Sequence, residues 1–301
     1  MPEPVSNYPV PHDRPLEYPG KRPPVSFVVK GKTVFRLQFL KSHKVSHASV
    51  VLGPGGGTLE LDEFLKQAGV APIEERFAVM GYGSNAVPGQ LLSKFGVDST
   101  VPVVFGRLGD SNLVYNLISN WGYAFAELAL GQTGSRASVA VTFLDKAQLE
   151  LMISSEQNYH LAVCPSNLHL QGGRALGGSS GAALYLFAGF RRLWIPSNHI
   201  CPVPIAALPS QGRQAVGLTQ QEVLQLVIED FDLYSVGIDR PLQLVNRLRE
   251  EAEWPEQSPK LKYTLQELVD KDPRSLPSLA SQLELVSPES QVPVGTALEA
   301  S

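Results

Sequence analysis

Apolar residues in the first part of the chain alternate with polar residues, in a pattern that predicts β-strands. Residues 26–52 show this two-residue period, interrupted by a Lys-Gly-Lys turn at Gly31. Further strand-like runs occur at 76–81, 101–105, 123–130, 137–143, 159–164, 182–187 and 192–195. The connections between most of these runs are short, which favours antiparallel pairing of neighbours.

Helical patterns interrupt the strands. Asn85 is placed to cap a helix that runs to residue 95. Thr219 and Glu222 stand three residues apart, as in a capping box. Other helices are expected at 61–68, after Asp145, at 239–254 and at 265–270. Because strands cluster with short connections between these helices, the pattern predicts an α+β fold with a mixed, largely antiparallel, barrel-like β core and flanking helices.

Composition divides the chain into five predicted parts. Residues 1–25 are rich in proline and lack a periodic pattern, which predicts a flexible N-terminal arm. Residues 26–75 form an N-terminal extension of strands and a short helix, and residues 76–235 form the core. Residues 236–284 contain C-terminal helices. Residues 285–301 are rich in Ser, Pro and Glu and predict a disordered tail.

Charge and composition exclude several classes of protein. The chain has 301 residues, is 43% hydrophobic and carries a net charge of −4. It has no dense Lys/Arg run, so no nucleic-acid partner is expected. No run approaches the length of a membrane span, and the first residues lack the apolar segment of a secretory signal, so a cytoplasmic location is predicted. Cys164 and Cys201 do not have the spacing of a metal site, and no metal is expected.

One carboxylate falls on an apolar helix face. Asp145 and a glutamine three residues later form a capping box, and Leu149, Met152, Ile153 and Glu156 then recur at helical spacing. Burial disfavours the charged form of a carboxylate unless a cation or several donors hold it. Such a group can act as a base near neutral pH. The alternative is that Glu156 ends the helix and reaches solvent.

The residues at 82–85 carry a resemblance to a known family. They read Tyr-Gly-Ser-Asn, follow a predicted buried strand, and precede a helix that contains Pro88. This arrangement resembles the gamma-glutamylcyclotransferase-like superfamily, which pairs such a loop with a glutamate at the end of a later helix. The similarity continues through residues 122–161, with the family's order of strand, Gly-Ser turn, strand, helix, glutamate and tyrosine. On this match Glu156 takes the place of the catalytic carboxylate, and Tyr159 that of the tyrosine entering the next strand.

The resemblance implies a reaction and a site. Members of the family cyclise a small gamma-glutamyl amide, releasing 5-oxoproline and an amine, and need no cofactor. Glu156 would be the general acid and base. The substrate-binding residues would be Tyr82, Gly83, Ser84, Asn85 and Tyr159. The chain departs from the family pattern at Ala86, at Gln157 and Asn158, and in the roughly 75 residues before the motif.

Two alternatives remain. The chain could be a non-catalytic member of the fold that binds a small ligand or a protein. The G-x-S-x-G pattern at 177–181, with Ser179 at its centre, also fits the nucleophile elbow of a serine hydrolase. An elbow needs a strand before it and a helix after it, whereas a glycine-rich loop precedes this pattern and a strand-like run follows. A hairpin loop is therefore predicted there. The sequence leaves the oligomeric state open.

Overall fold

The computed structural model describes residues 1–39, 44–53, 55–180, 182–208, 210–253, 261–287 and 293. The helices are α1 (Leu61–Gln67), α2 (Pro88–Phe95), α3 (Lys146–Ser155), α4 (Gln220–Asp230), α5 (Pro241–Glu253) and α6 (Leu261–Lys271). The strands are β1 (Glu3–Pro4), β2 (Phe27–Lys30), β3 (Thr33–Gln38), β4 (Ser49–Gly53), β5 (Gly57–Glu60), β6 (Phe77–Gly81), β7 (Thr100–Gly109), β8 (Ser111–Ile118), β9 (Ala124–Leu130), β10 (Arg136–Leu144), β11 (Tyr159–Val163), β12 (Leu168–Leu170), β13 (Ala175–Leu176), β14 (Tyr185–Gly189) and β15 (Ser210–Gln211).

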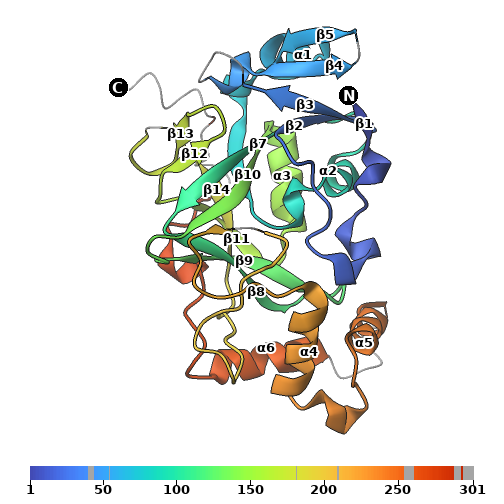
Figure 1. Cartoon of the computed structure of the whole chain (residues 1–301), viewed down its shortest axis with the longest axis vertical. Helices are drawn as coiled ribbons and strands as arrows, with labels where there is room; N and C mark the ends of the chain where they lie inside the picture. Colours follow the sequence, from blue (N-terminus) through green and yellow to red (C-terminus); the bar gives the residue numbers. More distant parts are fainter. Residues whose placement is uncertain are drawn as a thin grey trace.

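A large, mostly antiparallel sheet forms the centre of the molecule (Figure 1). Its strand order is β11-β14-β6-β10-β7-β2-β3-β4-β5, and along this path the β14–β6 pair is parallel. The hairpin β8–β9 is a separate two-stranded sheet. The predicted α+β class and antiparallel pairing are therefore confirmed. The predicted barrel is not seen as a closed one, because the strand pairs of the described residues follow an open path.

Helices α2 and α3 pack side by side on one face of the sheet. Leu91 of α2 and Leu149 and Met152 of α3 are fully buried in one cluster with residues of β2, β6 and β7. The predicted capping box opens α3, where the Asp145 carboxylate accepts from the backbone N–H of Gln148. The capping box of α4 is present as well. This packing brings the C-terminal ends of α2 and α3 close to the loop that follows β6.

One predicted cap is wrong. Val87, not Asn85, is the N-cap of α2, and Pro88 occupies the first turn. Proline suits this place because it has no N–H to leave unpaired. Asn85 lies in a preceding 3₁₀ turn, and its amide makes a different contact, described below. Strand β8 was not predicted, because its residues are buried on both faces and show no alternation.

The first 25 residues pack against the body of the protein, whereas the sequence predicted a flexible arm. Strand β1 pairs with β3, and Tyr8 and Tyr18 are almost fully buried. Prolines 11 and 15 each begin a short 3₁₀ turn. The composition indicated flexibility, but prolines restrict the backbone, and two aromatic side chains supply enough apolar area to anchor the segment.

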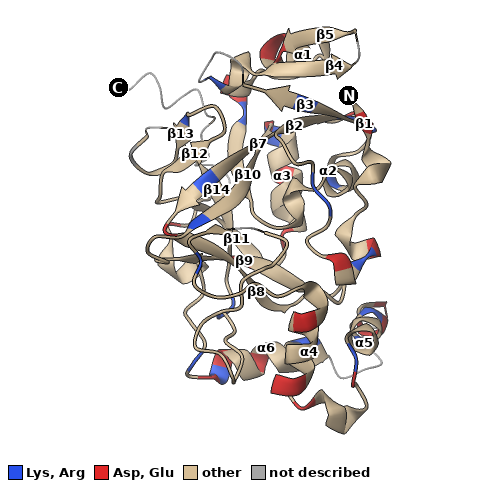
Figure 2. Ribbon diagram, viewed as in Figure 1, with Lys and Arg blue, Asp and Glu red and all other residues tan. Residues whose placement is uncertain are grey.

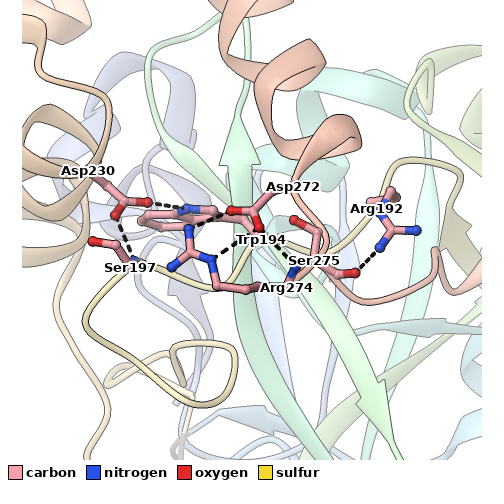
Figure 3. Close-up of polar contacts among 7 residues, drawn as sticks. All are labelled: Arg192, Trp194, Ser197, Asp230, Asp272, Arg274 and Ser275. Atoms are coloured by element: carbon pink, nitrogen blue, oxygen red, sulfur yellow. Dashed lines mark hydrogen bonds and ion pairs between the residues drawn. The ribbon is translucent and has the colours of Figure 1, made fainter.

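The C-terminal part is tied to the body by a polar network (Figure 3). The Asp230 carboxylate at the end of α4 accepts from the buried Trp194 indole at 2.9 Å and from the Ser197 backbone N–H at 2.7 Å. Arg192 donates to the backbone carbonyl of Ser275. The strand predicted at 192–195 is reduced to an isolated bridge from Leu193, because its residues bond to these side chains and to the C-terminal segment.

The predicted C-terminal helices are present as α5 and α6. Of the predicted tail at 285–301, residues 288–292 and 294–301 lie outside the described residues. Val286 donates its backbone N–H to the Leu161 carbonyl, so the start of this segment lies beside β11. Acidic residues are concentrated on helices such as α1 and α4, while few colour the strands of the main sheet (Figure 2). Among the described helices, none is long and apolar enough to cross a membrane.

Candidate active site

The chain leaves β6 through the 82–85 loop, which lies where β6 ends and α2 begins. Ser84–Ala86 form a 3₁₀ turn, whose first N–H groups have no partner within the turn. Gly83 is required by close packing: a Cβ there would lie 2.6 Å from the Tyr18 hydroxyl oxygen. The loop is therefore held against the N-terminal arm, with backbone donors available at its start.

Glu156 faces this loop. It is the C-cap residue of α3, and its Oε1 accepts from Asn85 Nδ2 at 2.9 Å and from Lys94 Nζ at 2.5 Å. The Glu156 and Lys94 side chains are 14% and 10% exposed. The alternative that Glu156 ends the helix and reaches solvent is therefore correct for its position but wrong for its side chain. Glu156 does end α3, but its side chain points inward.

A cavity of about 580 Å³ connects these residues. The five predicted substrate-binding residues, Tyr82, Gly83, Ser84, Asn85 and Tyr159, line it together with Glu156. Its wall also includes Tyr18 of the N-terminal arm and Tyr123, whose rings stack 4.4 Å apart. The site residues predicted from distant parts of the sequence therefore meet in one cavity, while their roles stay predictions.

Two tyrosines fasten the same residue on β9. The Tyr18 hydroxyl accepts from the backbone N–H of Ala126 at 2.8 Å, and the Tyr159 hydroxyl donates to the Ala126 carbonyl at 2.9 Å. Burial raises the pKa of both phenols well above the usual value, so they remain neutral. Tyr159 thus has a structural bond at its hydroxyl, and its ring forms part of the cavity wall.

Behind Tyr82 lies a buried carboxyl group. Glu127 of β9 is 1% exposed, and its Oε1 lies 3.0 Å from the Tyr82 hydroxyl and 3.1 Å from the Leu128 backbone nitrogen. Its Oε2 has no hydrogen-bond partner of good geometry, although the backbone N–H of Gly189 is near and lowers the pKa slightly. Burial is the larger effect and raises the pKa of Glu127 to about 8.

A neutral Glu127 explains the contacts of Tyr82. The Tyr82 hydroxyl lies within hydrogen-bond distance of both Glu127 and the Phe187 carbonyl, yet it carries only one hydrogen. If Glu127 is protonated, it donates to Tyr82, and Tyr82 donates to Phe187. These two hydrogen bonds fix the ring of Tyr82 at the cavity wall. Glu127 therefore positions a wall residue but does not line the cavity itself.

Sequence reasoning missed Lys94, Tyr18 and Glu127. Glu127 had a detectable signal, because it is the single charged residue in the apolar strand run AFAELAL. Lys94 had none, since a lysine near a helix C-terminus is usually solvated there. Tyr18 stands in a proline-rich segment with no periodicity, so nothing in its surroundings predicted burial.

The structure does not favour the serine elbow. The Ser179 side chain and Gly181 lie outside the described residues, but the flanking elements are known. The two-residue strand β13 precedes the motif, and strand β14, not a helix, follows it. Within the described ranges, no three His, Cys, Asp or Glu side chains are grouped so as to hold a metal ion.

No protein-family model matches the chain, and no curated protein matches its sequence. Two solved structures are similar in part: a gamma-glutamyl cyclotransferase, with 15% sequence identity and a TM-score of 0.31, and an uncharacterized protein from Homo sapiens, with 16% and 0.32. Each match covers 66% of this chain and 100% of the other. These TM-scores are too low to support an argument about family or function.

Proposed function

We propose that the chain is a gamma-glutamylcyclotransferase-type enzyme that cyclises a small gamma-glutamyl amide to 5-oxoproline. The observation that supports this best is the contact of Glu156 with Asn85, inside a cavity that the 82–85 loop also lines. The two are 71 residues apart in sequence and were singled out by different arguments, one from helix periodicity and one from a motif.

The reaction needs one proton carrier. The substrate's α-ammonium gives a proton to the Glu156 carboxylate, and the freed amine attacks the γ-carbonyl carbon to form a five-membered ring. As the amide C–N bond breaks, Glu156 returns this proton to the leaving nitrogen, and the ring nitrogen releases its remaining extra proton to solvent. A positioned acid and base of this kind contributes roughly 10²–10⁴-fold to the rate. The first N–H groups of the Ser84–Ala86 turn, which have no partner within the turn, are suited to stabilise the oxygen charge that forms during attack.

Lys94 sets a condition for this chemistry. Its ammonium occupies one oxygen of Glu156, so an incoming substrate ammonium competes with it for the carboxylate. Two cations beside one carboxylate repel each other at short range. We therefore expect Lys94 to shift toward solvent or toward the substrate's α-carboxylate when substrate binds.

The test is the detection of 5-oxoproline by mass spectrometry after incubation with a panel of gamma-glutamyl amines and peptides. The Glu156→Gln variant should lose at least about 100-fold in rate, in line with removal of a general acid and base. Glu150→Gln is the matched control, because Glu150 is an exposed glutamate on the same helix. Equal loss in both variants, or no loss in Glu156→Gln, would refute the role of Glu156.

The Lys94–Glu156 ion pair favours a second candidate, a ligand-binding protein without turnover. A carboxylate already neutralised by a lysine is available as a fixed polar contact and less available as a base. In that case calorimetry should detect binding of a gamma-glutamyl compound that wild-type protein leaves unchanged. Product formation by the wild type, lost in Glu156→Gln, excludes this candidate.

A further inference from the structure

A second cavity, of about 730 Å³, lies between the N-terminal arm and the main sheet, away from Glu156. Its wall is the arm at residues 21–24. Its floor is a face of β12, β7 and β10, where Arg107 stands directly opposite His169 on one side and Ser138 on the other. Residues paired across strands in this way project from the same face of a sheet. The register therefore sets three polar side chains in one row under the arm.

Arg22 forms the wall above this row. Its guanidinium lies 5.9 Å from the centre of the Phe105 ring, in a cation–π contact. Among the described residues no carboxylate or carbonyl accepts from it, and its Nη1 is buried without a hydrogen-bond partner. Burial lowers the pKa of Arg22 to about 10, so the side chain is still charged at neutral pH. A buried cationic nitrogen without an acceptor is unfavourable, and such groups normally have a partner.

The remaining charges around the cavity are also positive. Arg107 uses one nitrogen to contact Gln211 at 3.0 Å, which leaves its other donors available. Gln171 accepts from the Ser26 hydroxyl through its Oε1, so its amide nitrogen is left as a donor. Lys21 contributes less, because its ammonium lies over the Tyr8 ring. No aspartate or glutamate is present among the described residues that line this cavity.

We infer that this cavity binds a phosphate-bearing small molecule, whose phosphate group is held by Arg22 and Arg107 over the polar row of the sheet. A phosphate dianion matches two guanidinium groups in charge, and its oxygens accept from donors that approach from several directions. A single carboxylate would leave one guanidinium without a counter-charge. The size of the cavity leaves room for the organic part of the molecule. This inference is independent of the reaction proposed for Glu156.

The test is calorimetric titration of the full-length protein, at an ionic strength of about 0.1 M, with pyrophosphate and with succinate, a dicarboxylate of lower charge. The wild type should bind pyrophosphate more tightly than succinate. Arg22→Met, which keeps much of the apolar stem and removes the charge, should weaken pyrophosphate binding by about tenfold or more, as expected for lost hydrogen bonds to a charged group. Arg107→Met should weaken it as well.

Arg136→Met is the matched control. Arg136 is an exposed arginine on β10, in the same sheet, but it does not line the cavity. It removes the same charge but from outside the cavity, so it should change the affinity by less than about twofold, since charges that do not contact the bound anion are largely screened at this ionic strength. The inference is overturned if the wild type does not bind pyrophosphate, if succinate binds more tightly, or if Arg136→Met weakens binding as much as Arg22→Met. If circular dichroism shows that Arg22→Met is unfolded, Arg107→Met decides in its place.

Discussion

The buried carboxyl of Glu127 makes the stability of the protein depend on pH. Its pKa is about 8 in the folded protein and 4.5 for an unperturbed glutamate. Between these values the unfolded chain releases the proton while the folded protein keeps it. The folded state then binds more protons, so the free energy of unfolding falls as pH rises, by about 1.4 kcal/mol per pH unit for this one group. Over the whole interval the loss is about 5 kcal/mol.

The substitution Glu127→Gln isolates this effect. Glutamine has nearly the same size but never ionises, so its own contribution is constant with pH. Urea unfolding of both proteins should be measured from about pH 5.5 to about pH 7.5. Any packing or hydrogen-bond cost of the substitution appears as a constant offset. The difference in unfolding free energy between variant and wild type should shift in favour of the variant by about 3 kcal/mol across this range.

A flat difference would show that Glu127 ionises in the folded protein as readily as in the unfolded chain. A difference that shifts in favour of the wild type as pH rises would mean that the folded state prefers the ionised carboxylate. Either result would contradict the raised pKa of Glu127 and the hydrogen bond that a neutral Glu127 donates to Tyr82. Other groups that titrate in this range are common to both proteins and cancel in the comparison.

Three further substitutions test other contacts. Gly83→Ala places a Cβ 2.6 Å from the Tyr18 hydroxyl oxygen and should lower the free energy of unfolding by about 1–3 kcal/mol in urea titrations. Adding Tyr18→Phe should restore part of this stability, because the nearest remaining atom of the residue-18 ring would be the Cζ carbon, 3.7 Å from the new Cβ. Lys94→Met should lower the free energy of unfolding by about 2 kcal/mol, because it leaves Glu156 without its cation. In a Glu156→Gln background the same substitution should lower it markedly less; equal losses in the two backgrounds would exclude energetic coupling between Lys94 and Glu156. Asp230→Ala removes the acceptor of the Trp194 indole N–H and of the Ser197 backbone N–H. It should lower the free energy of unfolding by about 2 kcal/mol and lower Tm, and an unchanged Tm would contradict this expectation.

Local signals in the sequence predicted the elements that depend on local interactions. The capping boxes at Asp145 and Thr219 identified the starts of α3 and α4, because the side chain and the backbone group that it caps lie within three residues. The alternating strands were found for the same reason. Strand β8 was not, since burial on both faces depends on which elements cover it, and that is decided by tertiary packing.

In the candidate site, too, local signals identified single residues, whereas tertiary packing decided which of them meet. Periodicity singled out Glu156, and a motif singled out the loop around Asn85, but neither contained the contact between them. Lys94 reaches Glu156 only because α2 and α3 lie side by side, a fact of packing. Tyr18 enters the site from a segment that its composition marked as flexible. Side chains supplied by distant segments were therefore the part that could not be predicted.

The tilted ring pair of His12 and Trp121, which line the first cavity, provides an optical reporter. Trp121 lines that cavity, is 50% exposed, and lies 4.8 Å from the His12 ring. Trp194 is 1% exposed and does not line this cavity, so its emission serves as an internal reference. After replacement of Trp254, which lies outside the described residues, two indoles of very different polarity remain. A compound that enters the cavity should shift the redder emission of Trp121 and leave that of Trp194 unchanged, giving a binding signal without any label or coupled reaction.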